Sequence, residues 1–243
     1  MKKIILLTSI ISTILFAEIK PNHLMYGIEA ECDQVLKKNG YVNCYNHEER
    51  GPNFIQYNLT DGYMEKKIID KEILLFEDKE IEEEFRNTAE DYLTLKGLLP
   101  TKLKSSYSSS VSLKNKKDSS LFSNTVPMRD SVYNVWEKTE DFEKKLVKKY
   151  KTIHVVSGVT YQKRDPKREG MIGIPEYFYK IYFSPSTSKM LGLIIPHSNL
   201  KTKRNFYGYS VPVTDIEALT GNKFFPKLEK GLAKRIKRKI VYF

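Results

Sequence analysis

Three strand-like segments in the second half of the chain constrain its fold more than any other feature. They read "KTIHVVSGVTYQ", "IGIPEYFYKIYF" and "KMLGLIIPHS", and no helical pattern separates them. They are rich in the β-branched and aromatic residues that strands favour. Within the second segment, "EYFYK" is expected to pack two aromatic residues on one strand face and to project polar groups from the other. The chain has no internal repeats, and its strands and helices mix without a regular βαβ rhythm. The sequence therefore predicts an α+β fold, with a central, mostly antiparallel sheet flanked by helices.

The elements around these strands follow from local patterns. Residues 40–60 predict two strands around a turn at residues 50–53, because polar and apolar residues alternate after Gly51-Pro52. Trp136, Phe142, Leu146 and Tyr150 share one face of a predicted helix. Two polar stretches, 61–93 and the serine-rich 104–124, are expected to be mostly surface loops. The segment "PVTDIEALTG" predicts a short helix with a Thr214–Glu217 capping box and an end at Gly221.

The chain begins with two lysines and an apolar run that ends near Ala17. This run is too short to cross a bilayer and nothing like a stop-transfer segment follows it, so residues 1–17 are predicted to be a cleaved signal peptide. The mature protein is then expected to work outside the cytoplasm, either secreted or periplasmic. Residues 18–39 form an amino-terminal segment, residues 40–228 the main domain, and residues 229–243 a basic tail.

Cys32 and Cys44 are the two cysteines of the chain. In an oxidising compartment, two cysteines twelve positions apart are most simply explained by one disulfide. The alternative is a two-cysteine metal site, for which His47 is the only histidine at ligand spacing.

The chain is basic, with a formal net charge of +11 that falls to +9 when the two lysines of residues 1–17 are removed. Such a charge suits a polyanion as partner, nucleic acid or an anionic surface. The tail "PKLEKGLAKRIKRKIVYF" predicts a basic amphipathic helix with Lys234, Arg235 and Lys237 as candidate phosphate contacts. This helix could dock on the domain, bind nucleic acid or lie on a membrane surface.

Five segments occur in an order that resembles the DNA/RNA non-specific endonucleases, which are secreted ββα-metal nucleases. They are "AEDYLTLKGLLPT", "FSNTVPMRDSVYNVWEKTE", "VVSGV", "GIPEYFYKIYF" and "VTDIEALTGNKFFPKL", and the similarity runs from about residue 40 to residue 228. The resemblance implies a ββα-metal nuclease fold, metal-dependent hydrolysis of phosphodiester bonds, and nucleic acid as the partner. It also implies a magnesium or manganese ion as the cofactor if the protein is active.

The sequence departs from the family pattern where the family carries its general base. Aligning Gly97 to the glycine of the family's Arg-Gly-His triplet places Leu98 at the catalytic histidine, and leucine cannot accept a proton. Lys96 falls at the arginine, so the positive charge is kept but the planar fork that binds phosphate is lost. Leu95 takes the place of the aspartate. We therefore expect weak activity or none.

The metal-binding position also differs. The family's asparagine lies four residues before the tryptophan, where this chain has Val132, and counting from "SNTVP" gives Tyr133 instead. Asn134 is the nearest oxygen ligand, but on a helix it points about 200° away from Val132. Glu140 matches the family's glutamate beside the metal-bound water, with an ordinary surface glutamate as the alternative. Arg129, just before this helix, is a further candidate for phosphate contact.

Two histidines elsewhere in the chain are candidates to replace the missing general base. His197, at the end of a predicted strand, is the better candidate, whereas His154 lies within a strand. Three functions remain open: an active secreted endonuclease, a relative that binds nucleic acid without cutting it, and an envelope protein that uses the scaffold to contact a protein or membrane.

Overall fold

A computed structural model describes residues 22–61, 73–104, 107–109, 112–162, 167–198 and 205–243. The predicted signal peptide lies outside the described residues. A seven-stranded sheet forms the centre, with the strand order β12-β11-β10-β7-β4-β3-β2. All six neighbouring pairs in this sheet are antiparallel, which confirms the predicted α+β fold with an antiparallel sheet. Its strands are β2 (Gln34–Lys37), β3 (Val42–Asn46), β4 (Gly51–Thr60), β7 (Thr152–Thr160), β10 (Tyr177–Ser184), β11 (Lys189–Pro196) and β12 (Ser210–Val211).

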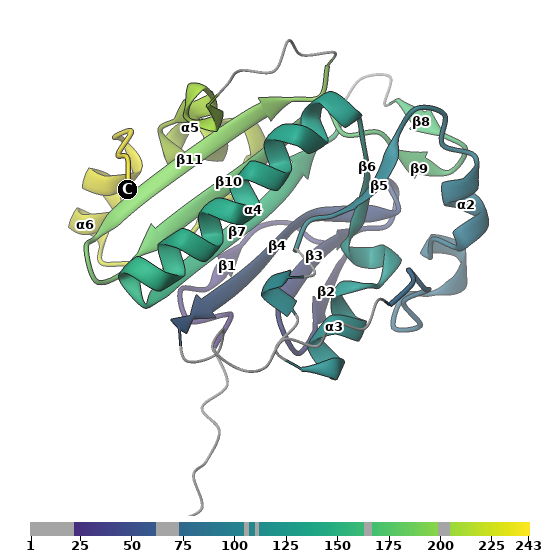
Figure 1. Cartoon of the computed structure of the whole chain (residues 1–243), viewed down its shortest axis with the longest axis horizontal. Helices are drawn as coiled ribbons and strands as arrows, with labels where there is room; N and C mark the ends of the chain where they lie inside the picture. Colours follow the sequence, from purple (N-terminus) through teal and green to yellow (C-terminus); the bar gives the residue numbers. More distant parts are fainter. Residues whose placement is uncertain (1–21, 62–72, 105–106, 110–111, 163–166, 199–204) are drawn as a thin grey trace, which may run out of the picture.

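Short ribbons and helices surround this sheet (Figure 1). The paired ribbons are β1 (Ile28–Glu29) with β13 (Lys223–Phe224), β5 (Leu99–Lys102) with β6 (Thr125–Met128), and β8 (Arg168–Glu169) with β9 (Ile172–Gly173). The α-helices are α2 (Ala89–Leu93), α3 (Leu113–Ser119), α4 (Asp130–Tyr150), α5 (Val213–Thr220) and α6 (Lys230–Lys237). The 3₁₀ turns are η1 (Glu83–Phe85), η2 (Tyr107–Ser109), η3 (Phe122–Asn124) and η4 (Phe206–Tyr209). None of the described helices is long and apolar enough to span a membrane.

The two faces of the sheet carry separate hydrophobic cores. On one face, α4 packs through Val132 and Trp136 against strand residues such as Phe178. On the other face, Tyr179 belongs to a core that includes Ile236 of α6, together with residues of α5 and β13. Successive side chains of a strand point to opposite faces, so a sheet covered on both sides has strands that are apolar throughout. The result is a three-layer arrangement with α4 on one side and α5 and α6 on the other (Figure 1).

The serine-rich stretch 104–124 is not the surface loop that its composition predicts. It contains α3 and the turns η2 and η3, and many of its polar side chains are buried. Asn124 is an example: its amide donates to the carbonyls of Lys104 and Ser119, and its carbonyl oxygen accepts from the Lys104 amide. Hydrogen bonding offsets the cost of burying these polar groups, and composition alone does not reveal such partners.

Two predicted element boundaries were wrong. The turn between β3 and β4 covers residues 47–50, and Gly51 already belongs to β4. Helix α5 is capped by Pro212 without a side-chain hydrogen bond, so the predicted Thr214–Glu217 capping box does not form. Glu217 instead accepts hydrogen bonds from the Phe224 amide and the Lys237 ammonium, which are distant in sequence. The predicted end at Gly221 is confirmed by its left-handed conformation, with φ at 77°.

Candidate active-site region

The strands β5 and β6 and the helix α4 make a ββα unit on one side of the central sheet. The two strands pair antiparallel, with Leu99 opposite Met128. Arg129 follows as the N-cap of α4. The predicted site residues therefore lie at one end of this unit, where the chain enters β5 and leaves β6. Figure 1 shows β5 and β6 running together toward the start of α4.

The entry to β5 presents a cation but no base. Lys96 and Gly97 are exposed, and Gly97 adopts a positive φ of 68°, which turns the chain into the strand. Leu98 comes next, half-buried, at the position that the resemblance assigns to a histidine. Arg129, at the other strand end, is also exposed. The region thus has two exposed cations, Lys96 and Arg129, around an apolar side chain that cannot take up a proton.

The metal-ligand position lies inside the core. Val132 is 0% exposed and packs in the same cluster as the fully buried Trp136. Asn134, the nearest amide, is exposed on a different side of α4, and so is Tyr133. A hard divalent cation needs oxygen ligands, and the methyl groups of Val132 offer none. The residues at this position therefore do not fit a metal ion, and the helix keeps the regular turn that separates Asn134 from Val132.

Glu140 lies on the half-buried side of α4 among other charged groups. Burial is the main cause that raises the pKa of Glu140 to about 7, and the nearby Glu143 carboxylate raises it further. The Lys180 ammonium opposes this shift. A carboxyl with such a pKa is protonated about half of the time at neutral pH, which is unusual for a surface glutamate. Glu140 is thus half-buried with a raised pKa, which favours the functional interpretation over that of an ordinary surface glutamate.

A buried ion pair beside Glu140 was missed by the sequence reasoning. The Lys180 ammonium of β10 donates to Glu143 Oε1 of α4 at 2.6 Å, and the two side chains are 0% and 2% exposed. Tyr57 of β4 donates to the same oxygen at 3.0 Å, and Lys180 lies 4.3 Å from the Trp136 ring centroid. Glu143 follows Trp136 by seven residues, so both side chains share one face of the helix. That spacing was the available signal, but the polar strand face predicted for "EYFYK" argued against burial.

A second buried lysine lies on the same side of the sheet. The Lys104 ammonium donates to the Ser108 carbonyl at 2.9 Å, to the Ser108 hydroxyl at 3.1 Å and to the Ser109 hydroxyl at 2.9 Å. It also lies over the Tyr57 ring. Burial lowers the pKa of Lys104 to about 7, against the opposing effect of Glu143 and Glu140. Its three hydrogen bonds anchor η2 beside the ββα unit, which is a structural task.

His197, the better replacement base among the histidines, is engaged in capping α4. Its Nε2 accepts a hydrogen bond from the Arg129 amide at 3.0 Å, and its Nδ1 lies 2.7 Å from the Pro175 carbonyl oxygen. This pairing requires the neutral tautomer with the proton on Nδ1. Burial also lowers the pKa of His197. With the lone pair of Nε2 already used, His197 is held in a structural role next to the candidate site.

The remaining histidines also have protein partners. His154 Nδ1 lies 2.5 Å from Asn58 Oδ1 within the sheet, and His23 Nδ1 accepts from the Asn58 amide at 2.9 Å. His47 stacks on the Phe85 ring, with 4.3 Å between the ring centroids. None of these three residues lies in the ββα unit. Each of the four histidines of this chain therefore already has a protein partner.

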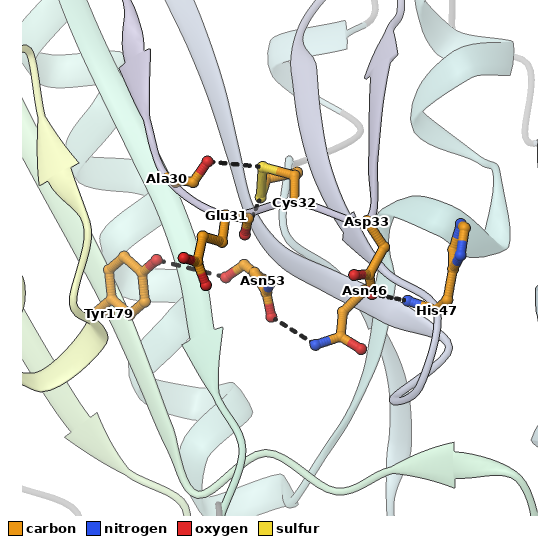
Figure 2. The surroundings of a disulfide bond; sticks show 9 residues. Ala30, Glu31, Cys32, Asp33, Asn46, His47, Asn53 and Tyr179 are labelled. Atoms are coloured by element: carbon orange, nitrogen blue, oxygen red, sulfur yellow. Dashed lines mark hydrogen bonds between the residues drawn. A yellow bond between two sulfur atoms is a disulfide. The ribbon is translucent and has the colours of Figure 1, made fainter.

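The cavity beside the disulfide has the wrong charge for a polyanion. The structure joins Cys32 to Cys44, and Figure 2 shows Glu31 and Asp33 next to this bridge. The Asp33 carboxylate accepts a hydrogen bond from the His47 amide at 2.8 Å. A cavity of about 780 Å³ opens here, and five carboxylates line it, those of Glu29, Glu31, Asp33, Glu48 and Glu49. Phosphate groups would be repelled at this cavity, so it is not a candidate surface for a polyanion.

The candidate phosphate contacts of the tail are separated from the ββα unit. Helix α6 docks through Ile236 on the sheet face opposite α4. Lys234 and Arg235 are exposed there. Lys237 does not belong with them, because it is 8% exposed and forms an ion pair with Glu217 at 2.7 Å. The prediction of Lys237 as a surface contact is therefore corrected. The structure brings Lys96, Leu98 and Arg129 together, and places Lys234 and Arg235 elsewhere.

Comparisons with known proteins agree with this architecture. A family model described as DNA/RNA non-specific endonuclease matches residues 20–231. The chain is 22% identical to the "Mitochondrial nuclease" of Saccharomyces cerevisiae over 244 aligned positions, covering 89% of this chain and 74% of the yeast protein. It is 25% identical to "Nuclease C1" of Cunninghamella echinulata, covering 85% and 88% of the two chains. A solved structure of the EndoG/EndoGI complex superposes with a TM-score of 0.76 at 21% identity, covering 86% of this chain and 91% of that one, and so shares the fold.

Proposed function

The chain belongs to the DNA/RNA non-specific endonuclease family, and we propose that it uses the nuclease fold to bind nucleic acid while having lost efficient phosphodiester hydrolysis. One observation carries this proposal: apolar side chains occupy both positions at which the family resemblance requires chemistry. Leu98 replaces the general base and the fully buried Val132 replaces the metal ligand. Loss of a general base typically lowers the rate by about two to four orders of magnitude.

The environment of these positions supports the same reading. Asn134 is exposed away from Val132, and His197 Nε2 already accepts a hydrogen bond from the Arg129 amide. Within the described part of the chain, no three side chains of histidine, cysteine, aspartate or glutamate come together as a metal site. Neither Asn134 nor His197 is therefore placed to take over either task.

Positive charge supports the binding half of the proposal. Lys96 and Arg129 are exposed at the ends of β5 and β6, and the whole chain carries a formal net charge of +11. Phosphate contacts by lysine and arginine supply most of the sequence-independent affinity for nucleic acid. Neither residue needs a metal ion for such a contact, so binding can persist where hydrolysis is lost.

We further propose that the protein works outside the cytoplasm. The apolar run that ends near Ala17 has the features of a signal peptide. The Cys32–Cys44 disulfide supports an oxidising compartment, because disulfides persist mainly there.

The decisive test incubates the purified mature chain with plasmid DNA and with RNA, in magnesium, in manganese and in EDTA. We expect no metal-dependent cleavage, together with a mobility shift that weakens as salt rises. Cleavage that depends on metal and disappears in Glu140→Ala would refute the loss of hydrolysis. Absence of both cleavage and shift would refute nucleic-acid binding and favour an envelope-interaction protein.

A gain-of-function series sharpens the test. The double variant Leu98→His/Val132→Asn restores the two side chains that the resemblance requires, and we expect it to cleave DNA in the presence of a divalent metal. Leu98→Gln/Val132→Asn is the matched control, since glutamine is polar but is not a base. Far-UV circular dichroism of both variants must match that of the wild type, because an amide at the buried position 132 costs stability.

A further inference from the structure

The outward face of α6 carries a dense group of cations, which we call the α6 surface. Its members are Lys230, Lys234, Arg235, Arg238 and Lys239, all of them exposed. At 100° per residue they cover about half of the helix circumference. The side chains of Lys230, Lys234, Arg238 and Lys239 form no hydrogen bond or ion pair with any residue that the structure describes. Glu229 is the one carboxylate among them, and it caps α6 by accepting from the amides of Gly231 and Leu232.

The opposite face of α6 is fixed to the protein. Ile236 is 6% exposed and packs in the core under the sheet, with Leu232 and Ala233 beside it. Lys237 locks the same face through its ion pair with Glu217. The chain end is also held, because the Phe243 ring packs against Tyr150 of α4, with 5.4 Å between the centroids. The helix that carries the α6 surface is therefore fixed on the protein.

The packing of α6 favours nucleic acid over a membrane surface as the anionic partner of the α6 surface. A helix that lies in a membrane interface buries an apolar face in the boundary of headgroups and acyl chains. The apolar face of α6 already packs on the sheet, and the large apolar side chains that remain exposed nearby, Ile240 and Tyr242, lie beyond the end of the helix. The backbone of a nucleic acid needs only cations, since it presents one negative charge per about 1.7 Å of duplex. Helix α6 is about 12 Å long, and Arg238 and Lys239 follow directly at its end. This length matches roughly seven phosphate charges.

From these observations we infer that the α6 surface is a second nucleic-acid-binding surface, separate from the ββα unit, so that one protein molecule can hold two nucleic-acid segments at once. This inference rests on the proposed function. Lys96 and Arg129 lie at the start of α4 on one side of the sheet, and α6 lies on the other side (Figure 1). A single duplex cannot contact both sides of the sheet while remaining straight.

Salt dependence measures the size of the α6 surface. Five phosphate contacts give a slope of about −4.5 in a plot of log K against log salt, equal to roughly a 500-fold loss of affinity between about 50 and 200 mM. The test variant is Lys234→Gln/Arg235→Gln/Arg238→Gln/Lys239→Gln, which lowers the net charge by four and leaves Lys237 and the packed apolar side chains intact. Lys114→Glu/Lys117→Glu, at two exposed lysines of α3, is the control for net charge.

Two readouts on the full mature chain test the inference. Fluorescence anisotropy with a short DNA duplex gives the salt slope, and an immobilised duplex reports whether protein bound to it captures a second, labelled duplex. We expect the wild type and the α3 control to capture the second duplex. The α6 variant should bind the first duplex with a smaller slope and capture no second one.

Other outcomes separate the inference from the function on which it rests. If the wild type binds duplex and the α6 variant has the same slope and the same capture, the second surface does not exist but the proposed function stands. If the wild type binds no duplex even at low salt, both fail. Tighter binding of the wild type to vesicles containing phosphatidylserine than to duplex, lost in the α6 variant, would assign the α6 surface to membranes and overturn the inference.

Discussion

The buried pair of Lys180 and Glu143 gives the sharpest prediction about what holds α4 on the sheet. Replacing Lys180 by methionine keeps most of the side-chain volume but leaves the Glu143 carboxylate buried without its cation. Glu143 Oε1 would keep only the Tyr57 hydroxyl, at 3.0 Å. Removing one partner of a buried ion pair costs about 3–5 kcal/mol. For a chain of this length, such a loss lowers the melting temperature by roughly 6–20 °C.

The assay is chemical denaturation of the mature wild type, Lys180→Met, Glu143→Leu and the double variant. We expect each single variant to lose about 3–5 kcal/mol, and the double variant to lose much less than the sum, because it buries no unpaired charge. If Lys180→Met costs less than about 1 kcal/mol, or if the two losses add, the pair does not stabilise this interface and the reasoning is wrong.

Three further predictions concern the rest of the fold. Burial lowers the pKa of His23 and of His154 from 6.5 to about 4. As the pH falls, the unfolded chain therefore binds these protons before the folded protein does. The stability contributed by the two neutral rings is at most about 3 kcal/mol each. It should be complete above pH 6.5 and be lost as the pH falls toward 4. Unfolding titrations across that range test this, and His154→Asn should flatten the curve, whereas an unchanged curve would contradict burial of the neutral ring. His197→Ala removes the acceptor for the Arg129 amide and should cost about 1 kcal/mol of stability, with no effect expected from Lys96→Ala in the same melting experiment. Cys32→Ser/Cys44→Ser opens the disulfide loop and should lower the free energy of unfolding by about 3 kcal/mol. Dithiothreitol should lower the melting temperature of the wild type but not that of this variant. An equal effect on both proteins would show that reduction acts elsewhere.

The sequence was most informative where local patterns repeat. The alternation and aromatic content of "IGIPEYFYKIYF" predicted a strand, and the spacing of Trp136, Phe142, Leu146 and Tyr150 predicted the helix α4. Both predictions depend on the period of a single element, so they needed no knowledge of its neighbours. The same was true of Gly221, because a left-handed residue after a helix favours glycine.

Local sequence patterns did not predict contacts between residues that are distant in the sequence. Glu217 was predicted to cap its own helix, but it pairs with Lys237 twenty residues later. Lys180 was expected on a polar strand face, yet α4 covers that face and supplies Glu143 as its partner. Ser108 and Ser109 are buried for a similar reason, since the ammonium of Lys104 holds η2 in place. Burial of a polar group depends on whether a partner arrives, which a local pattern does not contain.

By itself, the sequence determined that Leu98 and Val132 stand where the family resemblance requires a base and a metal ligand, since side-chain chemistry is fixed by residue type. Only the tertiary structure decided how the side chains around them are engaged. It uses the lone pair of His197 to cap α4 and encloses Val132 in the core. It also placed the cations of α6 on the sheet face opposite Lys96 and Arg129. The physical reason is that the apolar side chains of α6 must be buried, and they pack on the sheet face that α4 does not cover.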